Sequence, residues 1–132
     1  MIKQLTDDAE ILFRQIHPNF WQDGEPSSQP FMPTPKDKNQ LSVDRSTLTT
    51  AAGSFALFAG NGRATKAVYG LTVGEFRILE IDCQSDPLPP TEFRSANPAH
   101  ASADYSAHSG NQQKTKAKRL KQNAIARGQL HP

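Results

Sequence analysis

The sequence has little cysteine, few apolar residues and no long hydrophobic run, and each shortage excludes a class of protein. The single cysteine, Cys83, excludes an intramolecular disulfide framework and favours a reducing compartment, so we expect a cytoplasmic protein. The most apolar stretch, around residues 55–58, is far too short to cross a bilayer, and the acidic residues 1–10 lack a signal-peptide core. We therefore expect no membrane partner.

Apolar residues make up only 36% of the 132 residues, and the mean hydropathy is −0.63. A chain of this length fits one domain, which we place over residues 1–132. Its core must be small, and long polar or proline-rich segments must lie outside that core.

Alternation of apolar and polar residues predicts a small sheet. Residues 11–17 alternate, and Pro18 ends the run because it disfavours helical geometry at the residue before it. A helix is the alternative for this first segment. The stretch VGEFRIL (73–79) is also ambiguous, since it fits either strand or one turn of helix between two strands. Further strands are expected at 41–44, 67–73, 77–83 and 99–106, with a short edge strand around 29–32.

Two segments predict helices. Residues 46–59 are rich in alanine and carry an apolar face, with Ser46 as the expected cap and the Gly60–Gly62 turn as the stop. Residues 111–128 form a basic C-terminal helix that ends at Gly128. The expected fold is α+β: a small, mainly antiparallel sheet of four to five strands packed by two helices, with a long proline-rich loop.

The proline-rich loop covers residues 18–40. Its proline density excludes interior strands and helices, because each proline removes a backbone donor. Aromatic residues within the loop supply apolar anchors, so we expect it to be packed rather than disordered. Trp21 and Phe31 are candidate contacts for a partner.

Charge is unevenly distributed along the chain. All thirteen acidic residues lie at or before Asp104, and the segment after it is basic. This asymmetry indicates a negatively charged partner, either protein or nucleic acid, although a solvated helix face explains it as well. The candidate partner-binding residues in this segment are Lys114, Lys118, Arg119 and Lys121.

A second set of polar residues is suited to binding an anion. Arginine offers paired donors, lysine a point charge and serine a hydroxyl, as phosphate binding requires. The alternative is structural: these groups can tie the loop to the sheet through its free carbonyls. The candidates are Arg14, His17, Lys36, Ser42 and Arg45.

No motif predicts a metal or another cofactor, and we expect neither. In a strand His100 and Asp104 share a face but lie roughly 13 Å apart, too far to hold one ion. Cys83 is interpreted as a small buried apolar residue, and no Gly-x-Ser-x-Gly elbow is present.

Two resemblances bear on function. The chain resembles ADP-ribosyltransferases in the R–S–E order of three residues, here Arg14, Ser42 and either Glu75 or Glu80. This resemblance would imply a nucleotide substrate. The segments RQIHP, SSQPFMPTPKD and LSVDR resemble a family of small uncharacterised bacterial proteins over nearly the full length, which implies no activity.

The sequence as a whole favours a small bacterial interaction module that binds protein or nucleic acid and could oligomerise. A toxin–antitoxin, immunity or phage-defence context fits such small proteins in general and depends on no residue here. The alternative is an enzyme that acts on a nucleotide or another anion. Its site would contain Arg14, His17, Ser42 and Arg45.

Overall fold

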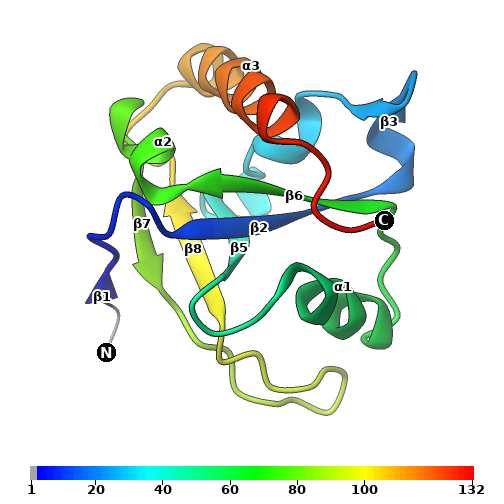
Figure 1. Ribbon diagram of the computed structural model, residues 1–132. Coiled ribbons are helices and arrows are strands. Elements are labelled where there is room, and N and C mark those ends of the chain that lie inside the picture. The colour runs from blue at the N-terminus through cyan, green and yellow to red at the C-terminus, as the bar shows by residue number, and fades with distance from the viewer. Residues whose placement is uncertain (1–2) are drawn as a thin grey trace.

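The computed structural model describes residues 3–132 and contains a six-stranded antiparallel sheet with helices on both faces (Figure 1). The predicted α+β class and mainly antiparallel sheet are confirmed, but the sheet has six strands rather than four to five. Its spatial order is β1-β7-β8-β5-β2-β6. The strands are β1 (Lys3–Gln4), β2 (Ile11–Ile16), β5 (Gln40–Arg45), β6 (Ala67–Thr72), β7 (Asp82–Ser85) and β8 (His100–Asp104).

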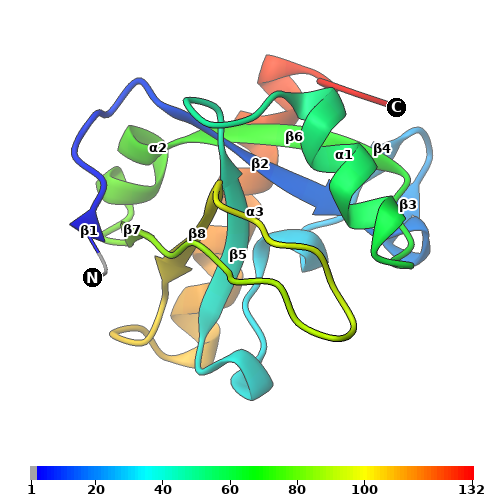
Figure 2. The ribbon, with the colours of Figure 1, turned by 90° about the horizontal axis from the view of Figure 1, so that it is seen from below.

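Three helices pack on this sheet, one more than expected. Helix α3 (Gly110–Arg127) and the short α2 (Val73–Ile78) cover one face, whereas α1 (Ala51–Gly60) and the loop 86–99 lie on the other (Figures 1 and 2). The alternative of a helical turn at VGEFRIL is therefore the correct one. Thr72 and Glu75 form a capping box there, which satisfies backbone donors that a strand would have paired with a neighbour.

The helix predicted from Ser46 begins five residues later, at Ala51. Thr50 caps it by accepting a hydrogen bond from the Gly53 amide. Ser46 instead accepts a hydrogen bond from the Ile11 amide at 3.1 Å, which ties the chain after β5 to the start of β2. Residues 46–50 therefore lie outside the helix, and Ser46 helps to hold the end of β5 next to β2.

Apolar and polar side chains alternate along the strands, so one face of the sheet is mainly apolar and the other mainly polar. The face under α3 holds the main core, to which β2 contributes Leu12 and Ile16 and β8 contributes Ala101 and Ala103. The face under α1 carries Gln15, Ser42, Asp44, His100 and Ser102, because these residues alternate with the core residues and pair across the strands. Polar chemistry is therefore concentrated on the α1 face.

The proline-rich loop is folded against the α3 face. It contains the 3-10 turns η1 (Pro18–Phe20), η2 (Gln29–Phe31) and η3 (Pro35–Asp37), and the two-stranded ribbon of β3 (Trp21–Gln22) and β4 (Glu25–Pro26). An edge strand was expected around 29–32, but Pro30 lies at the start of a 3-10 turn, a position where its missing amide costs nothing. Phe31 is fully buried, and its carbonyl accepts a 2.7 Å hydrogen bond from Tyr105 Oη.

Both outer edges of the sheet are short or covered. Strand β1 has two residues, and the outer edge of β6 is partly paired by the C-terminal segment, where Val68 and His131 form an isolated bridge. Within residues 3–132 no helix has the length and apolar character needed to span a membrane.

Candidate functional site

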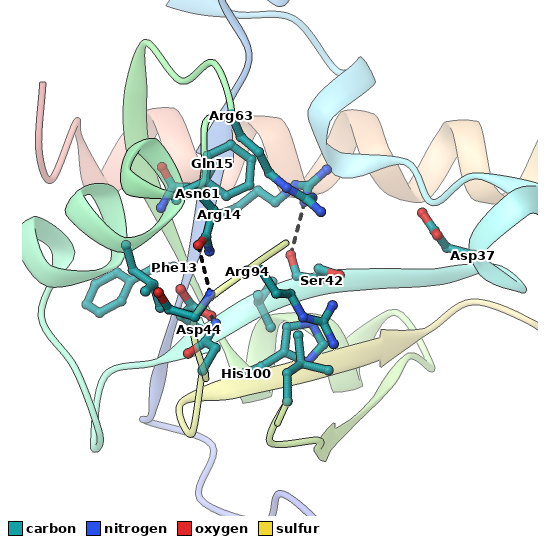
Figure 3. Close-up of a pocket in the computed structure, with 16 residues that line it drawn as sticks. Phe13, Arg14, Gln15, Asp37, Ser42, Asp44, Asn61, Arg63, Arg94 and His100 are labelled. Atoms are coloured by element: carbon teal, nitrogen blue, oxygen red, sulfur yellow. Dashed lines mark hydrogen bonds between the residues drawn. The ribbon is translucent and has the colours of Figure 1, made fainter. Parts of the chain in front are cut away.

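A cavity of about 240 Å³ opens on the α1 face, between α1, loop 86–99 and strands β2 and β5 (Figure 3). Three arginines line it: Arg14 from β2, Arg63 from the turn after α1, and Arg94 from loop 86–99. None of them forms an ion pair with a described carboxylate. We call this site the arginine cavity.

The cavity exists because β2 and β5 separate. They pair only at Leu12 with Arg45 and at Phe13 with Asp44, whereas β2 pairs with β6 over its full length. Arg14, the next residue of β2, extends into the gap that results. Its Nε donates to the Pro30 carbonyl at 2.6 Å and its Nη1 to the Ser42 carbonyl at 3.1 Å.

The Arg14 guanidinium is held by carbonyls and not by a carboxylate, so its charge is not neutralised locally. Its Nη2 has no hydrogen bond to the described residues. Burial lowers the pKa of Arg14, while Tyr105 and Asp37 raise it. The group remains a cation at neutral pH, because an arginine pKa starts so high.

Arg94 is the least satisfied polar side chain of the cavity. Its Nε is fully buried without a hydrogen-bond partner, the only such side-chain atom among residues 3–132. A buried donor without a partner costs free energy, and native proteins rarely leave one unless something else binds there.

Loop 86–99 is fixed in place by several contacts. Asn97 Nδ2 donates to Asp44 Oδ1 at 2.8 Å, and the Ser95 amide donates to Asn61 Oδ1 at 3.0 Å. Leu88 and Asn97 exchange two backbone hydrogen bonds, so the loop is closed at its base. Arg94 is therefore presented to the cavity by an anchored loop.

Arg63 is the third arginine that lines the cavity. It is exposed, and its guanidinium lies over the Phe58 ring at 5.7 Å from the centroid. In Figure 3 the guanidinium groups of Arg14 and Arg63 lie on one side of Ser42 and that of Arg94 on the other. Three arginine groups around one hydroxyl-bearing residue form a surface suited to a compact, multiply charged anion.

Two carboxylates also line the cavity. Asp44 is already bound, since its Oδ2 accepts from Ser54 Oγ at 2.6 Å and its Oδ1 from Asn97. Asp37 accepts from the Thr34 hydroxyl and lies apart from the three arginines (Figure 3). Neither one occupies the space between the guanidinium groups.

Of the five anion-binding candidates, the structure brings together Arg14 and Ser42. Arg45 binds Glu10 through two hydrogen bonds of 2.8 and 3.1 Å on the other side of the β2–β5 pairing. This hydrogen bond raises the pKa of Arg45, although burial opposes it. His17 accepts a hydrogen bond from the Asn19 amide, and Lys36 is exposed next to Asp37 without lining the cavity.

The residues of the R–S–E order do not come together in one site either. Glu75 lies in α2, where it bonds the Thr72 amide and pairs with Arg127, and Glu80 follows α2. Neither glutamate lines the arginine cavity that contains Arg14 and Ser42.

The basic candidates form a second surface on α3. Lys114, Lys118 and Lys121 follow each other at spacings of four and three residues, so they share one side of the helix and are called the lysine stripe. Arg119 is exposed on another side. Helix α3 has no acidic residue, and none of these cations forms an ion pair with a described carboxylate.

The two aromatic candidates differ in accessibility. Phe31 is fully buried in the core and is not available as a surface contact. Trp21 is half-buried, with its ring 6.2 Å from that of Tyr69 and the Lys66 ammonium 5.9 Å from its centroid. Only Trp21 offers surface to a partner.

Sequence reasoning missed Arg63, Arg94 and His100 as cavity residues. Arg63 and Arg94 belong to irregular segments with no periodicity, and the contacts that place them are distant in sequence. The alternation of β8 did place His100 on the polar face, and that is the one signal that could have pointed to it.

Comparisons with protein-family models, with curated proteins and with solved structures found no match. Among residues 3–132 no group of three His, Cys, Asp or Glu side chains is placed to hold a metal ion. Function is therefore inferred from the geometry of the arginine cavity and the lysine stripe.

Proposed function

We propose that the protein binds a compact phosphate-bearing ligand in the arginine cavity. The observation that carries this proposal is Arg94, which lines the same cavity as two further arginines without an ion pair to a described carboxylate, and whose buried Nε has no hydrogen-bond partner among the described residues. Arginine donates paired hydrogen bonds that match the oxygens of a phosphoryl group. A bound phosphate would accept hydrogen bonds from these guanidinium groups.

The size of the cavity restricts the ligand. About 240 Å³ is slightly below the usual range for small-molecule sites. Besides the three arginines, the lining includes the apolar residues Leu57, Phe58 and Leu88. A phosphate ester with a small organic group suits such a mixed lining, because arginines can bind its charged head and apolar side chains can contact its organic part.

Replacing Arg94 by alanine is expected to weaken binding of phenylphosphonate by about 10-fold or more, because hydrogen bonds to charged groups contribute roughly 1.5–3 kcal/mol. Isothermal titration calorimetry measures the dissociation constant. Arg94→Lys should recover only part of the affinity, since lysine lacks the paired donors.

The matched control for this experiment is Arg77→Ala, which removes an arginine that pairs with Asp8 and lies outside the arginine cavity. It should bind phenylphosphonate as the unmodified protein does. Absence of any binding by the unmodified protein, or equal affinity in Arg94→Ala, would contradict the proposal.

The lysine stripe supports a second candidate function, contact with the backbone of a nucleic acid. The observation in its favour is a helix that carries exposed cations and no acidic residue, and whose stripe forms no ion pair within residues 3–132. Such contacts are insensitive to sequence and weaken steeply with salt. This interaction would occur on the sheet face opposite the arginine cavity (Figure 1).

Reversing the charge of Lys118 with Lys118→Glu is expected to weaken binding of a fluorescent DNA duplex and to lower the slope of log affinity against log salt by about 1. Fluorescence anisotropy over a salt series measures both. Lys3→Glu, which reverses an exposed lysine of β1, is the control for net charge. An equal effect of the two variants would show that only total charge matters and would exclude the stripe as a site.

We include a cytoplasmic location in the proposal, because both candidate functions are compatible with it. Cys83 supports it as a free cysteine without a disulfide partner, and burial raises the pKa of its thiol to about 12. A thiol of this kind stays protonated and serves as a packing residue.

A further inference from the structure

The arginine cavity contains a second group of side chains that ligand binding alone does not require. His100 lines the cavity, and its Nδ1 lies 2.8 Å from the Asp86 carbonyl oxygen and 3.5 Å from Asp86 Oδ2. A carbonyl oxygen can only accept, so Nδ1 carries the proton. In the neutral ring, Nε2 is then the basic nitrogen.

This basic nitrogen is free to act on a ligand. Nε2 of His100 has no hydrogen bond to residues 3–132, and the residue lines the cavity. Asp86 is itself held, because Ser102 Oγ donates to its Oδ2 at 3.1 Å. The imidazole is therefore fixed in tautomer and orientation by a positioned neighbour, as an acid–base group requires.

Ser42 lies beside this histidine. In the antiparallel register Ser42 is opposite Ser102 and Asp44 is opposite His100, so Ser42 and His100 are diagonal neighbours on the same face. Diagonal pairs are about 7–8 Å apart at the backbone, which leaves their side chains within reach of each other or of a group between them. The Ser42 side chain is exposed, and its Oγ makes no hydrogen bond to the described residues.

Two of the arginines lie near Ser42. Arg14 donates to the carbonyl of Ser42 itself at 3.1 Å, and Figure 3 shows Ser42 between the guanidinium groups of Arg14 and Arg94. A phosphoryl group bound by the arginines would have its phosphorus near the Ser42 oxygen. The same cations would stabilise the charge that accumulates on the phosphoryl oxygens during transfer.

We propose that the protein hydrolyses small phosphate monoesters, with Ser42 as the nucleophile, His100 as the general base and Asp86 as the residue that orients His100. This inference rests on the proposed function, since it requires the phosphate to bind in the arginine cavity. It explains why a histidine, a free hydroxyl and three arginines share one cavity.

The reaction has two steps. The Ser42 oxygen bonds to phosphorus, its proton passes to His100 Nε2, and the bond from phosphorus to the ester oxygen breaks. That proton then moves to the departing oxygen, which leaves as an alcohol. In the second step His100 takes a proton from water, the water oxygen bonds to phosphorus, and the bond to Ser42 breaks with return of the proton to the serine. Water is the only co-reactant, and no electrons are transferred.

The experiment measures turnover and binding separately. Release of p-nitrophenolate from p-nitrophenyl phosphate gives kcat, and calorimetry with phenylphosphonate, whose carbon–phosphorus bond is not cleaved, gives the dissociation constant. Ser42→Ala and His100→Asn are expected to lower kcat by about 100-fold or more while affinity changes by less than about threefold. Asparagine at position 100 can still donate to the Asp86 carbonyl, which protects the local fold. Ser106→Ala, an exposed serine outside the cavity, should leave turnover unchanged.

Mass spectrometry of acid-quenched reactions supplies the second readout. The unmodified protein is expected to carry one phosphoryl group on Ser42, and Ser42→Ala none. If the unmodified protein binds phenylphosphonate but releases no p-nitrophenolate, the catalytic proposal is overturned and the binding proposal stands. If phenylphosphonate does not bind, both fail. Turnover by Ser42→Ala at the unmodified rate would exclude Ser42 as the nucleophile.

Discussion

Replacing Arg14 by alanine is expected to lower the free energy of unfolding by about 2–4 kcal/mol and to abolish phosphate binding in the arginine cavity. The loss of stability follows because the Pro30 and Ser42 carbonyls lose their donor and the gap between β2 and β5 is left unfilled. The loss of binding follows because one of three cations disappears. Urea unfolding monitored by circular dichroism gives the first quantity, and calorimetry gives the second.

A companion variant separates the two effects. Arg14→Met keeps most of the apolar stem, so it should retain more stability than alanine while losing phosphate affinity equally. Arg119→Ala, which removes an exposed arginine of α3, is the control and should change stability by no more than about 0.5 kcal/mol. Unfolding of Arg14→Ala at the urea concentration of the unmodified protein would mean that Arg14 does not join the two strands.

Replacing Phe31 by alanine is expected to cost about 3–5 kcal/mol of stability, a large share of the roughly 5–15 kcal/mol typical of whole domains. Phe31 is fully buried among core residues, and truncation would leave a cavity where the proline-rich loop meets the core under α3. Its carbonyl also holds the Tyr105 hydroxyl, so movement of the loop would leave that buried group unpaired.

Chemical denaturation and limited proteolysis test this second expectation together. Proteolytic cuts within residues 18–40 should appear in Phe31→Ala at protease concentrations that leave the unmodified protein intact. The matched control is Phe93→Ala, because that ring is 84% exposed and its loss should change stability by about 0.5 kcal/mol at most. Equal denaturation midpoints for the two variants would refute a structural role for Phe31.

The strands with clean alternation could be predicted from the sequence. Residues 11–16 and 100–104 are strands as predicted, and alternation along them separates Leu12, Ile16, Ala101 and Ala103 in the main core from Gln15, His100 and Ser102 on the α1 face. The predicted number of strands was wrong because two segments have weak local sequence signals. Strand β1 has two residues, and the segment after β6 forms helix α2 between two strands. The Thr72-x-x-Glu75 capping pattern was the available signal for that helix.

The cavity was harder to predict because contacts distant in sequence build it. The sequence identified Arg14 and Ser42, which lie on strands, and grouped them with Arg45, which the structure places on Glu10. No sequence pattern pointed to Arg94. Its position depends on the contacts of Asn97 with Asp44 and of Ser95 with Asn61, which no local pattern encodes.

The protection of the sheet edges has a practical consequence for work with this protein. A long, bare edge strand invites other chains to add to it and begin aggregation. Here β1 offers only two residues, and the backbone around His131 occupies part of the β6 edge. A purification tag fused at the C-terminus should therefore follow a flexible spacer, so that Leu130 and His131 remain seated and the protein stays monodisperse at high concentration.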